Sequence, residues 1–284
     1  MYIINDPELL RAKISELKQQ KSAIAFVPTM GNLHKGHLQL VDQAKKKAQT
    51  VVVSIFVNPM QFNNSEDLQN YPKTVAADTQ LLEQQGVDIV FIPSADVIYP
   101  NGLEKQSYVE VPGLSDSLEG ALRPGHFRGM STIVNKLFNL VQPDYACFGE
   151  KDFQQLLIVK QMVADLAIPV EIISVPTVRE KSGLAMSSRN GKLTLAEKEK
   201  APFLAQLMNK IATALDNQQT DYAILTEQAS RELDSHGFRT DAINIVDSST
   251  LQNVSSNTKQ VVILMAAFLG GTRLIDNKTV NLRH

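Results

Sequence analysis

The clearest chemical signal in the sequence is a pair of histidines, His34 and His37, in the segment PTMGNLHKGH (28–37). An apolar run at 23–27 precedes the segment and predicts a strand, and apolar residues at helical spacing follow it. Histidines three positions apart at the start of a helix lie on the same face. Because backbone N–H groups and the helix dipole already favour an anion there, the pair predicts a triphosphate site in which both imidazoles donate to phosphate oxygens.

A pair of surface histidines or a zinc site would use the same two residues. A zinc site needs a third ligand, and none stands nearby in the sequence. Two of the chain's five histidines stand within four residues, directly after an expected strand and a tight turn at Gly31. This placement favours the phosphate site over a surface pair, and no site in which protein side chains hold a metal is expected.

A second polar segment, SIFVNPMQF (54–62), also follows an expected strand. The strand ends at Asn58–Pro59, because proline cannot donate to a strand ladder, and Gln61 then stands beyond the strand end. A neutral amide both donates and accepts hydrogen bonds, which suits a small hydroxy acid. The spacing alone, however, favours an ordinary turn glutamine.

A third segment, FGEKDFQQ (148–155), stands where an expected strand ends and a helix opens. Gly149 permits close approach of the backbone to a ligand, and Asp152 is placed either to cap the helix or to accept ribose hydroxyls. Lys151 offers a mobile point charge for phosphate oxygens. An exposed charged turn is the alternative for Glu150 and Asp152, and it explains Lys151 less well.

A fourth segment, TVREKSGLAMSSRN (177–190), carries hydroxyls and a cation. Ser187 and Ser188 followed by Arg189 predict a phosphate clamp, which Gly183 would allow to move. A further basic loop in the segment 123–137 is either a lid over the polyphosphate or a solvated surface, and it contains Arg123, His126 and Arg128. The residues alone do not choose between these two.

In this order, the four segments resemble those of the pantothenate synthetase family. The strand–loop–HxGH–helix pattern alone is similar to the ATP signature of the wider superfamily of nucleotidylyltransferases and class I aminoacyl-tRNA synthetases. The combination of PTMGNLHKGH, FVNPMQF, GEKDFQQ and AMSSRN is far more specific. The resemblance runs from about residue 23 to about residue 190 and is loose beyond. It implies an ATP-dependent ligase that activates pantoate as an acyl-adenylate and passes the pantoyl group to β-alanine.

The resemblance also implies roles for single residues. Three residues would be catalytic: His34, His37 and Lys151. Of these, His37 would donate a proton to the departing phosphate. Three amides would bind pantoate and β-alanine: Asn58, Gln61 and Gln155. ATP would be contacted by Met30, Gly31, Asn32, Leu33, His34, Lys35, Gly36, His37, Gly149, Glu150, Lys151, Asp152, Val178, Met186, Ser187, Ser188 and Arg189. Unlike the superfamily's KMSKS-type loop, MSSRN contains no lysine, so its cationic work would pass to Arg189 and Lys151.

ATP is then a substrate, with Mg²⁺ held mainly by its phosphates and by water, and the resemblance suggests a homodimer. The alternative is a nucleotidylyltransferase of the same superfamily, whose phosphorylated acceptor would need cations where this sequence has neutral amides. A binding module without catalysis is disfavoured because the histidines, the lysine and the serines all stand together. A tRNA-charging role is disfavoured by the net charge of −2.

The spacing of elements predicts an α/β fold in which a doubly wound, Rossmann-like parallel sheet positions these segments. The expected strands cover 23–27, 50–57, 87–93, 144–149 and 169–178, and the helices between the later ones cover 74–85, 131–141 and 153–166. After about residue 190 the pattern changes to helices at 195–215 and 221–235, followed by DAINIVD and a hairpin of two strands joined at Gly270–Gly271. We therefore expect a Rossmann-like domain over 1–183, which binds ATP and pantoate, and a smaller C-terminal α+β lid domain over 184–284.

The composition argues against several other classes of protein. A net charge of −2 argues against a broad nucleic-acid surface, and the basic run Lys45–Lys47 is expected on a solvated helix face. No run approaches the roughly 20 apolar residues that span a bilayer, and the N-terminal segment lacks the pattern of a secretory signal, so a cytoplasmic protein is expected. Cys147 is the single cysteine, and its apolar neighbours predict a packed strand residue without a chemical role.

Overall fold

The computed structural model describes residues 1–282, which form two compact units. Unit 1 consists of Met1–Glu150 and Gln154–Pro176, and unit 2 consists of Lys151–Phe153 and the chain from Thr177 onward. The division falls after Pro176, whereas the sequence places it after residue 183. The segment GEKDFQQ contributes residues to both units.

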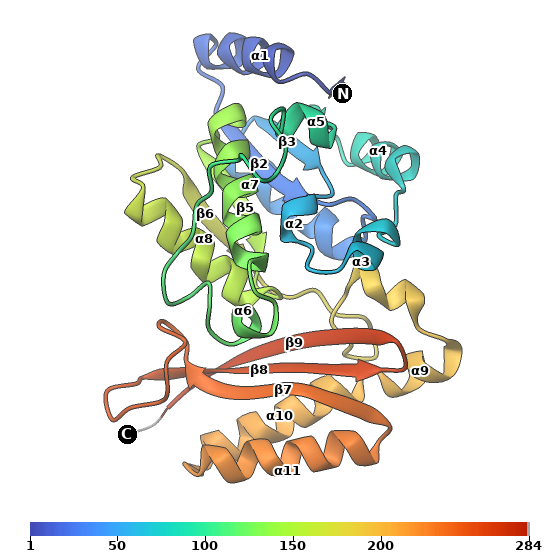
Figure 1. Ribbon diagram of the computed structural model, residues 1–284, viewed down its shortest axis with the longest axis vertical. Coiled ribbons are helices and arrows are strands. Elements are labelled where there is room, and N and C mark those ends of the chain that lie inside the picture. The colour runs from blue at the N-terminus through green and yellow to red at the C-terminus, as the bar shows by residue number, and fades with distance from the viewer. Residues whose placement is uncertain (283–284) are drawn as a thin grey trace. The chain divides into compact units, whose positions relative to one another are not determined.

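Unit 1 is built on a six-stranded sheet in which every neighbouring pair of strands is parallel (Figure 1). The strand order is β1-β4-β3-β2-β5-β6. The strands are β1 (Tyr2–Ile4), β2 (Ile24–Thr29), β3 (Thr50–Ile55), β4 (Ile89–Phe91), β5 (Tyr145–Gly149) and β6 (Glu171–Val175). Strand order reverses between β2 and β5, and ligands of open parallel sheets bind beyond the carboxyl ends of the strands at such a reversal.

Helices cover both faces of this sheet. Successive residues of a strand point to opposite faces, and since most residues of the central strands β2 and β3 are apolar, both faces must be buried. On β2, Phe26 packs into the core that contains residues of α1 (Pro7–Gln19), α7 (His126–Val141) and α8 (Phe153–Asp165). Its neighbours Ala25 and Val27 pack into the other core, which contains residues of α2 (Lys35–Lys47) and α4 (Val75–Gln84). The expected doubly wound α/β fold is confirmed.

Several elements of unit 1 differ from the sequence-based expectation. Neither β1 nor α1 is among the elements expected from the sequence, although Asp6 caps α1 by accepting from the Glu8 and Leu9 N–H groups at 2.7 and 3.0 Å. An aspartate followed by Pro7 is a start signal for a helix that the sequence did contain. Helix α7 begins at His126, five residues before the expected start at 131, so part of the basic loop is helical.

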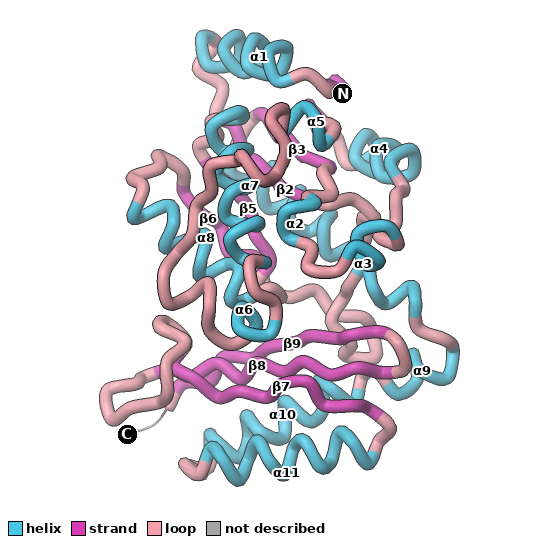
Figure 2. Tube along the Cα trace, viewed as in Figure 1, coloured by secondary structure: helices cyan, strands magenta, loops and turns pink. Residues whose placement is uncertain are grey.

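Unit 2 contains a three-stranded antiparallel sheet in the order β7-β8-β9 with two helices packed on it (Figure 2). The strands are β7 (Phe238–Asp247), β8 (Gln260–Leu269) and β9 (Thr272–Asn281), and the helices are α10 (Phe203–Asp216) and α11 (Tyr222–Ser235). The expected hairpin at Gly270–Gly271 is confirmed. The helical pattern expected over 195–215 is not one continuous helix. It divides into α9 (Leu195–Lys200) and α10 at Pro202, which has no N–H to continue a helix.

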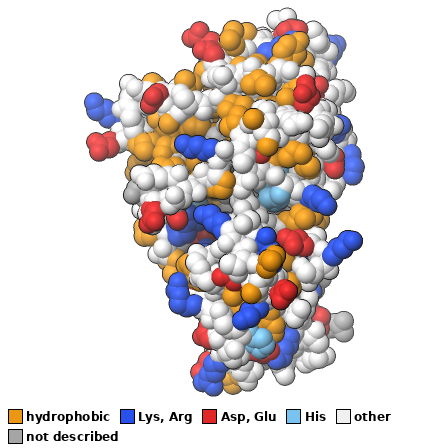
Figure 3. All heavy atoms as spheres, turned by 90° about the vertical axis from the view of Figure 1, so that its right-hand side faces the viewer, with side chains coloured by type: hydrophobic (Ala, Val, Ile, Leu, Met, Phe, Trp, Pro, Cys, Tyr) orange, Lys and Arg blue, Asp and Glu red, His pale blue; other side chains and the backbone are white. Residues whose placement is uncertain are grey.

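The remaining elements are short: η1 (Pro59–Gln61), α3 (Ser65–Gln69), α5 (Ala95–Ile98), α6 (Glu119–Leu122) and η2 (Ser188–Lys192). Within residues 1–282, no helix combines the length and the apolar character needed to cross a membrane. On the face drawn in Figure 3, basic and acidic side chains are interspersed with apolar ones.

Candidate functional site

The turn after β2 has a backbone that few sequences tolerate. Gly31 has a φ of 82°, which confirms the expected tight turn, and Asn32 follows with a φ of 51°. Asp78, from α4, holds this turn: its two carboxylate oxygens accept from the N–H groups of Asn32 and Leu33 at 2.9 and 2.8 Å. The Thr74 hydroxyl donates to the same carboxylate at 2.9 Å. With Asp78 only 2 % exposed, the turn is fixed by a buried carboxylate.

His34 and His37 form a capping arrangement at the start of α2. The Gly36 N–H donates to Nδ1 of His34 at 3.1 Å, and the His34 N–H donates to Nδ1 of His37 at 3.3 Å. The two rings lie side by side, with centroids 4.2 Å apart. Because Nδ1 of each ring accepts a hydrogen, the proton of each neutral imidazole is placed on Nε2. Both histidines are therefore oriented as Nε2–H donors.

The segment after β3 forms a buried group of amides. The Asn58 Nδ2 group donates to Oε1 of Gln61 and to the Gly129 carbonyl, both at 3.0 Å. The Gln61 Nε2 group contacts the sulfur of Met30 at 3.4 Å, which joins this segment to the histidine turn. Asn58 and Gln61 are 1 % and 8 % exposed. The structure thus brings Met30, Asn58 and Gln61 together.

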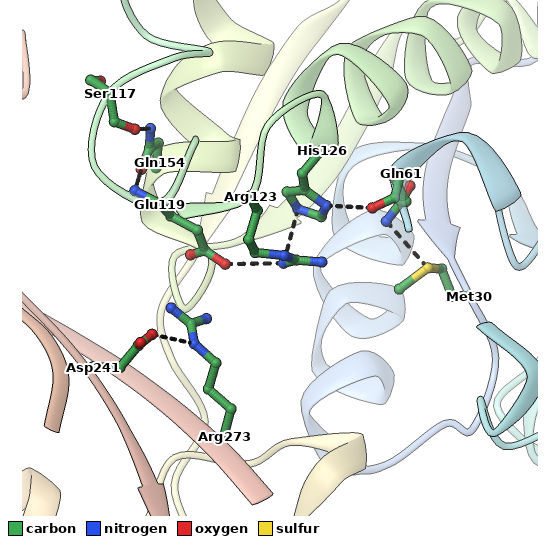
Figure 4. Close-up of polar contacts among 9 residues, drawn as sticks. All are labelled: Met30, Gln61, Ser117, Glu119, Arg123, His126, Gln154, Asp241 and Arg273. Atoms are coloured by element: carbon green, nitrogen blue, oxygen red, sulfur yellow. Dashed lines mark hydrogen bonds and ion pairs between the residues drawn. The ribbon is translucent and has the colours of Figure 1, made fainter. Parts of the chain in front are cut away.

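The two glutamines at the start of α8 differ in their contacts, and Figure 4 shows those of Gln154 with Ser117 and Glu119. Gln154 donates to the carbonyls of Leu114 and Ser117 at 2.8 Å each and accepts from the Glu119 N–H at 3.3 Å. Its amide is therefore occupied by the loop that precedes α6. Gln155 is half-buried, and its side-chain amide makes no hydrogen bond with another described residue, so this amide is available for a ligand.

Three basic residues of the segment 123–137 lie in different surroundings. Arg123 donates to Glu119 at 3.1 Å and lies 3.3 Å from Nε2 of His126. His126 is buried, and its Nδ1 donates to the Gln61 carbonyl at 2.8 Å, as Figure 4 shows. Arg128 pairs with Glu110 at 2.9 Å, and this ion pair raises the pKa of Arg128. His126 therefore belongs to the support of Gln61 and not to a solvated loop.

In unit 2, two neighbouring residues of β9 hold the cation-bearing segments. The Asn277 Nδ2 group donates to the Lys151 carbonyl at 2.8 Å. Asp276 accepts two hydrogen bonds from the guanidinium of Arg179, at 2.6 and 2.9 Å. Arg179 pairs in turn with Ala185 in a bridge across the 177–190 loop, in which the Met186 N–H donates to the Val178 carbonyl at 2.9 Å. Strand β9 thus anchors both Lys151 and this loop.

The end of this loop presents its side chains at a short helix. Ser187 caps η2 by accepting from the Arg189 N–H at 3.2 Å. The Asn190 Nδ2 group donates to the Ala185 carbonyl at 3.0 Å and closes the loop. Neither the Arg189 guanidinium nor the Lys151 ammonium forms a hydrogen bond or ion pair with another residue of the described chain. The backbone is fixed while the two cationic ends are not.

The expected site residues therefore fall into two groups, each in one unit. Unit 1 contains the turn and helix start from Met30 to His37, the amides, and the half-buried Gly149 and Glu150 at the end of β5. Unit 2 contains Lys151, the exposed Asp152 and the residues of the 177–190 loop. An added Cβ at Gly149 would meet no atom within 4 Å, so the β5 end is open to close approach.

Comparisons with known proteins identify the family. A family model described as Pantoate-beta-alanine ligase matches residues 2–279. The chain belongs to this family. It is 67 % identical to the pantothenate synthetase of Psychromonas ingrahamii over 284 residues, which cover 100 % of this chain and 98 % of that protein. It is 57 % identical to the Aeromonas hydrophila pantothenate synthetase, covering 99 % of each chain.

Solved structures agree with the family assignment. Pantothenate synthetase from Thermus thermophilus matches with a TM-score of 0.89 and 41 % identity, covering 98 % of this chain and 99 % of that one. Pantoate-beta-alanine ligase from Francisella tularensis, solved with βγ-ATP and β-alanine, matches with a TM-score of 0.82 and 37 % identity, covering 98 % and 97 %. The chain is therefore an ATP-dependent ligase, which decides against the nucleotidylyltransferase alternative.

Four residues that support the candidate site were not identified from the sequence: Asp78, Tyr99, Asp276 and Asn277. Asp78 stands in the first turn of a helix, where an acidic residue is common. Asp276 and Asn277 stand in the region where the family resemblance is loose. Tyr99 donates to Oδ1 of Asn58 at 2.6 Å, although it stands 41 residues away along the chain. Each acts through a long-range contact, which leaves no local pattern.

Proposed function

We propose that this ligase makes pantothenate in two steps through a pantoyl-adenylate. In the first step the carboxylate of pantoate attacks the α-phosphorus of ATP, and pyrophosphate leaves. In the second step the amine of β-alanine attacks the adenylate carbonyl, and AMP leaves. A carboxylate oxygen leaves readily only once it is adenylated, so both steps follow from the chemistry of the amide bond. Catalysis is then mostly positioning and stabilisation of developing charge.

The observation that carries this proposal is the orientation of the two histidines. Nδ1 of both His34 and His37 accepts a backbone N–H, so both rings carry their neutral-state proton on Nε2. Two aligned donors at the start of α2 suit the oxygens that gain charge as pyrophosphate departs. We assign His37 as the proton donor to the departing phosphate, with His34 as a second donor beside it.

The cations and hydroxyls of unit 2 would complete the phosphate contacts. Lys151 and Arg189 carry charges that no other described residue neutralises, and the hydroxyls of Ser187 and Ser188 stand next to Arg189 in the chain. A lysine ammonium is a compact charge on a flexible stem, which suits a polyphosphate whose charge shifts during reaction. The domain expected over 184–284 would act as the lid that carries Ser187, Ser188 and Arg189, and the domain over 1–183 would hold ATP and pantoate.

Pantoate would bind in the pocket of neutral amides formed by Asn58, Gln61 and Gln155. Gln61 and Gln155 would contact it, and Asn58, whose own amide is engaged within the chain, would hold Gln61. Hydrogen bonds to amides satisfy hydroxyls and a carboxylate without introducing a buried charge. A phosphorylated acceptor would bring about two negative charges, and burying them unpaired would be costly. We therefore expect turnover with pantoate and none detectable with 4′-phosphopantetheine.

The metal would arrive with the nucleotide. Among residues 1–282, no group of three or more His, Cys, Asp or Glu side chains is placed to hold a metal ion. Both oxygens of Asp78, the carboxylate nearest the histidine turn, are occupied by N–H and O–H donors. These residues fit a Mg²⁺ ion that keeps phosphate and water ligands, and it would neutralise charge on the polyphosphate. A homodimer, suggested by the family resemblance, and a location in the cytoplasm complete the proposal.

Exchange of labelled pyrophosphate into ATP tests the two-step route. With ATP, Mg²⁺ and pantoate but no β-alanine, we expect exchange, because adenylation needs no amine. Omission of pantoate is the control and should abolish exchange. Exchange that appears only when β-alanine is present would overturn the free adenylate intermediate. Mass spectrometry of the complete reaction should then find pantothenate, AMP and pyrophosphate.

A further inference from the structure

A buried hydrogen-bond chain leads from Tyr99 to the amide of Gln61. The Tyr99 hydroxyl donates to Oδ1 of Asn58 at 2.6 Å, and Nδ2 of Asn58 donates to Oε1 of Gln61 at 3.0 Å. All three side chains are buried: Tyr99 is 4 % exposed, Asn58 1 % and Gln61 8 %. Burial also raises the pKa of Tyr99 above its ordinary value, so the hydroxyl keeps its proton at working pH and can donate.

The direction of this chain is set by backbone groups. The Met60 N–H donates to Oδ1 of Asn58 at 3.3 Å, and Nδ2 of Asn58 donates to the Gly129 carbonyl at 3.0 Å. A flipped Asn58 amide would place a donor against an N–H group and an acceptor against a carbonyl. Only one orientation satisfies both. Asn58 therefore donates to Gln61, and the oxygen of the Gln61 amide is occupied.

The backbone of Gln61 is held as firmly as its side chain. His126 donates to the Gln61 carbonyl at 2.8 Å. Helix α7 approaches so closely that a Cβ at Gly129 would lie 2.5 Å from the Met60 carbonyl oxygen and 2.7 Å from the Gln61 nitrogen. Oε1 of the Gln61 amide already accepts from Asn58, whereas its Nε2 group contacts the sulfur of Met30, a weak acceptor, at 3.4 Å. Nε2 is therefore the end of the amide that gains most from a stronger partner.

Tyr99 is itself fixed in place. Lys136, from α7, donates to the carbonyl of Ile98 and lies 5.4 Å from the centroid of the Tyr99 ring. The Tyr99 ring also packs near Phe56, with centroids 6.3 Å apart. A phenylalanine in its place would keep these contacts of the ring and lose only the hydrogen bond to Asn58.

We propose that Tyr99 is a positioning residue that locks Asn58 and, through it, orients Gln61 as a hydrogen-bond donor to an acceptor oxygen of pantoate. This inference rests on the proposed function, because it needs pantoate to bind at Gln61. It goes beyond that function by assigning polarity: Gln61 gives N–H to the substrate and does not accept from it. The substrate atom beside Gln61 is thus a carboxylate oxygen or a hydroxyl lone pair.

Steady-state kinetics of Tyr99→Phe tests the proposal. Without the hydroxyl, Asn58 keeps its bonds to Met60 and Gly129, so folding survives. Oδ1 of Asn58 would then accept only from the Met60 N–H, and the Asn58 amide would be held less firmly. We expect the pantoate KM to rise about tenfold, the scale of one net hydrogen bond, with the ATP KM unchanged. The matched control is Tyr145→Phe, which removes a hydroxyl at the start of β5 in the same unit and should change neither KM.

A double-mutant cycle separates an effect through Gln61 from a general loss of structure. In the background of Gln61→Ala, Tyr99→Phe should raise the pantoate KM by less than about twofold, because residues that act through one another are not additive. An unchanged pantoate KM in the single variant, an equal rise in both KM values, or full additivity in the cycle would each overturn the proposal. If wild-type protein lacks pantoate-dependent pyrophosphate exchange, the proposed function itself has failed.

Discussion

The histidine turn in unit 1 and the Lys151–Arg189 group in unit 2 are held in different ways. In the histidine turn the functional side chains themselves are fixed, because Nδ1 of each ring accepts a backbone N–H. In the other group only the backbone is fixed, by Asn277 and by the loop contacts of Arg179. The cationic ends of Lys151 and Arg189 make no hydrogen bond or ion pair within the described chain.

This difference matches the two kinds of interaction that the proposed reaction requires. A proton donor must point at one atom, since a hydrogen bond weakens steeply away from linearity. A cation acts through a Coulomb interaction that falls slowly with distance and can follow charge as it moves over phosphate oxygens. The chain therefore places its rigid contacts where direction matters. Variants that change orientation or charge separately test this contrast between the two groups.

The largest effect is expected from removing either functional end. His37→Ala and Lys151→Ala should each slow adenylation by at least roughly a hundredfold, the scale for one preorganised donor to developing charge. The measurement is the rate of pyrophosphate exchange at saturating ATP and pantoate. Thermal unfolding serves as the control, and a near-normal exchange rate in a folded variant would remove that residue from the site.

Conservative replacements at the same positions then separate direction from charge. Lys151→Arg keeps the charge and should retain activity within about tenfold of wild type, since no partner fixes the ammonium. His37→Gln has a similar polar end but cannot reproduce the imidazole geometry, and it should remain as impaired as His37→Ala. Equal losses in the two conservative variants would contradict the contrast between the two groups.

A smaller effect is expected from Asp78→Asn, which disturbs the turn without touching a histidine. The amide would turn an NH₂ group toward a backbone N–H, at a cost of roughly 1–3 kcal/mol for a buried unsatisfied donor. We expect the ATP KM to rise about tenfold. We expect the free energy of unfolding to fall by roughly 1–3 kcal/mol. Asp88→Asn is the control, because Asp88 accepts the Val51 N–H at 2.8 Å at the other end of the sheet. Loss of stability with an unchanged ATP KM would make Asp78 purely structural.

A still smaller effect is expected from Asn277→Ala in unit 2. It removes one hydrogen bond to the Lys151 carbonyl and leaves the lysine side chain intact. We expect the exchange rate to fall about three- to fivefold, close to the net value of one neutral hydrogen bond. Asn281→Ala, also on β9, removes a bond to Gln260 at 2.8 Å and should leave exchange unchanged. A loss as large as that of Lys151→Ala would mean that the backbone of Lys151 matters as much as its charge.

Local patterns in the sequence predict one part of this molecule well and another part poorly. The parallel strands and the histidine turn follow from apolar runs and a glycine, because a buried strand and a positive φ both restrict residue types locally. The supports of the site follow from contacts such as Asp78 with Leu33 or Tyr99 with Asn58, which join residues 45 and 41 positions apart. No pattern within one element encodes such a pair. The division of the GEKDFQQ segment between two units had no local signal either.

The last and smallest effect concerns Cys147, which reports on unit 1 alone. Cys147 is completely buried in β5, and burial raises its pKa to about 11, so about one thiol in a thousand is ionised at pH 8. Alkylation must then proceed mainly through molecules whose unit 1 has opened, at a rate set by the free energy of that opening.

The measurement is the rate at which iodoacetamide labels Cys147 at pH 8. Wild type should be labelled very slowly, and molecules that have not been labelled should keep their activity. Asp78→Asn weakens unit 1 and should speed labelling, whereas Asn277→Ala weakens a contact of unit 2 and should leave the rate within about twofold of wild type. Fast labelling of both variants would show that the two units open together. The two groups of site residues would then differ in how their side chains are held and not in the stability of the unit that carries them.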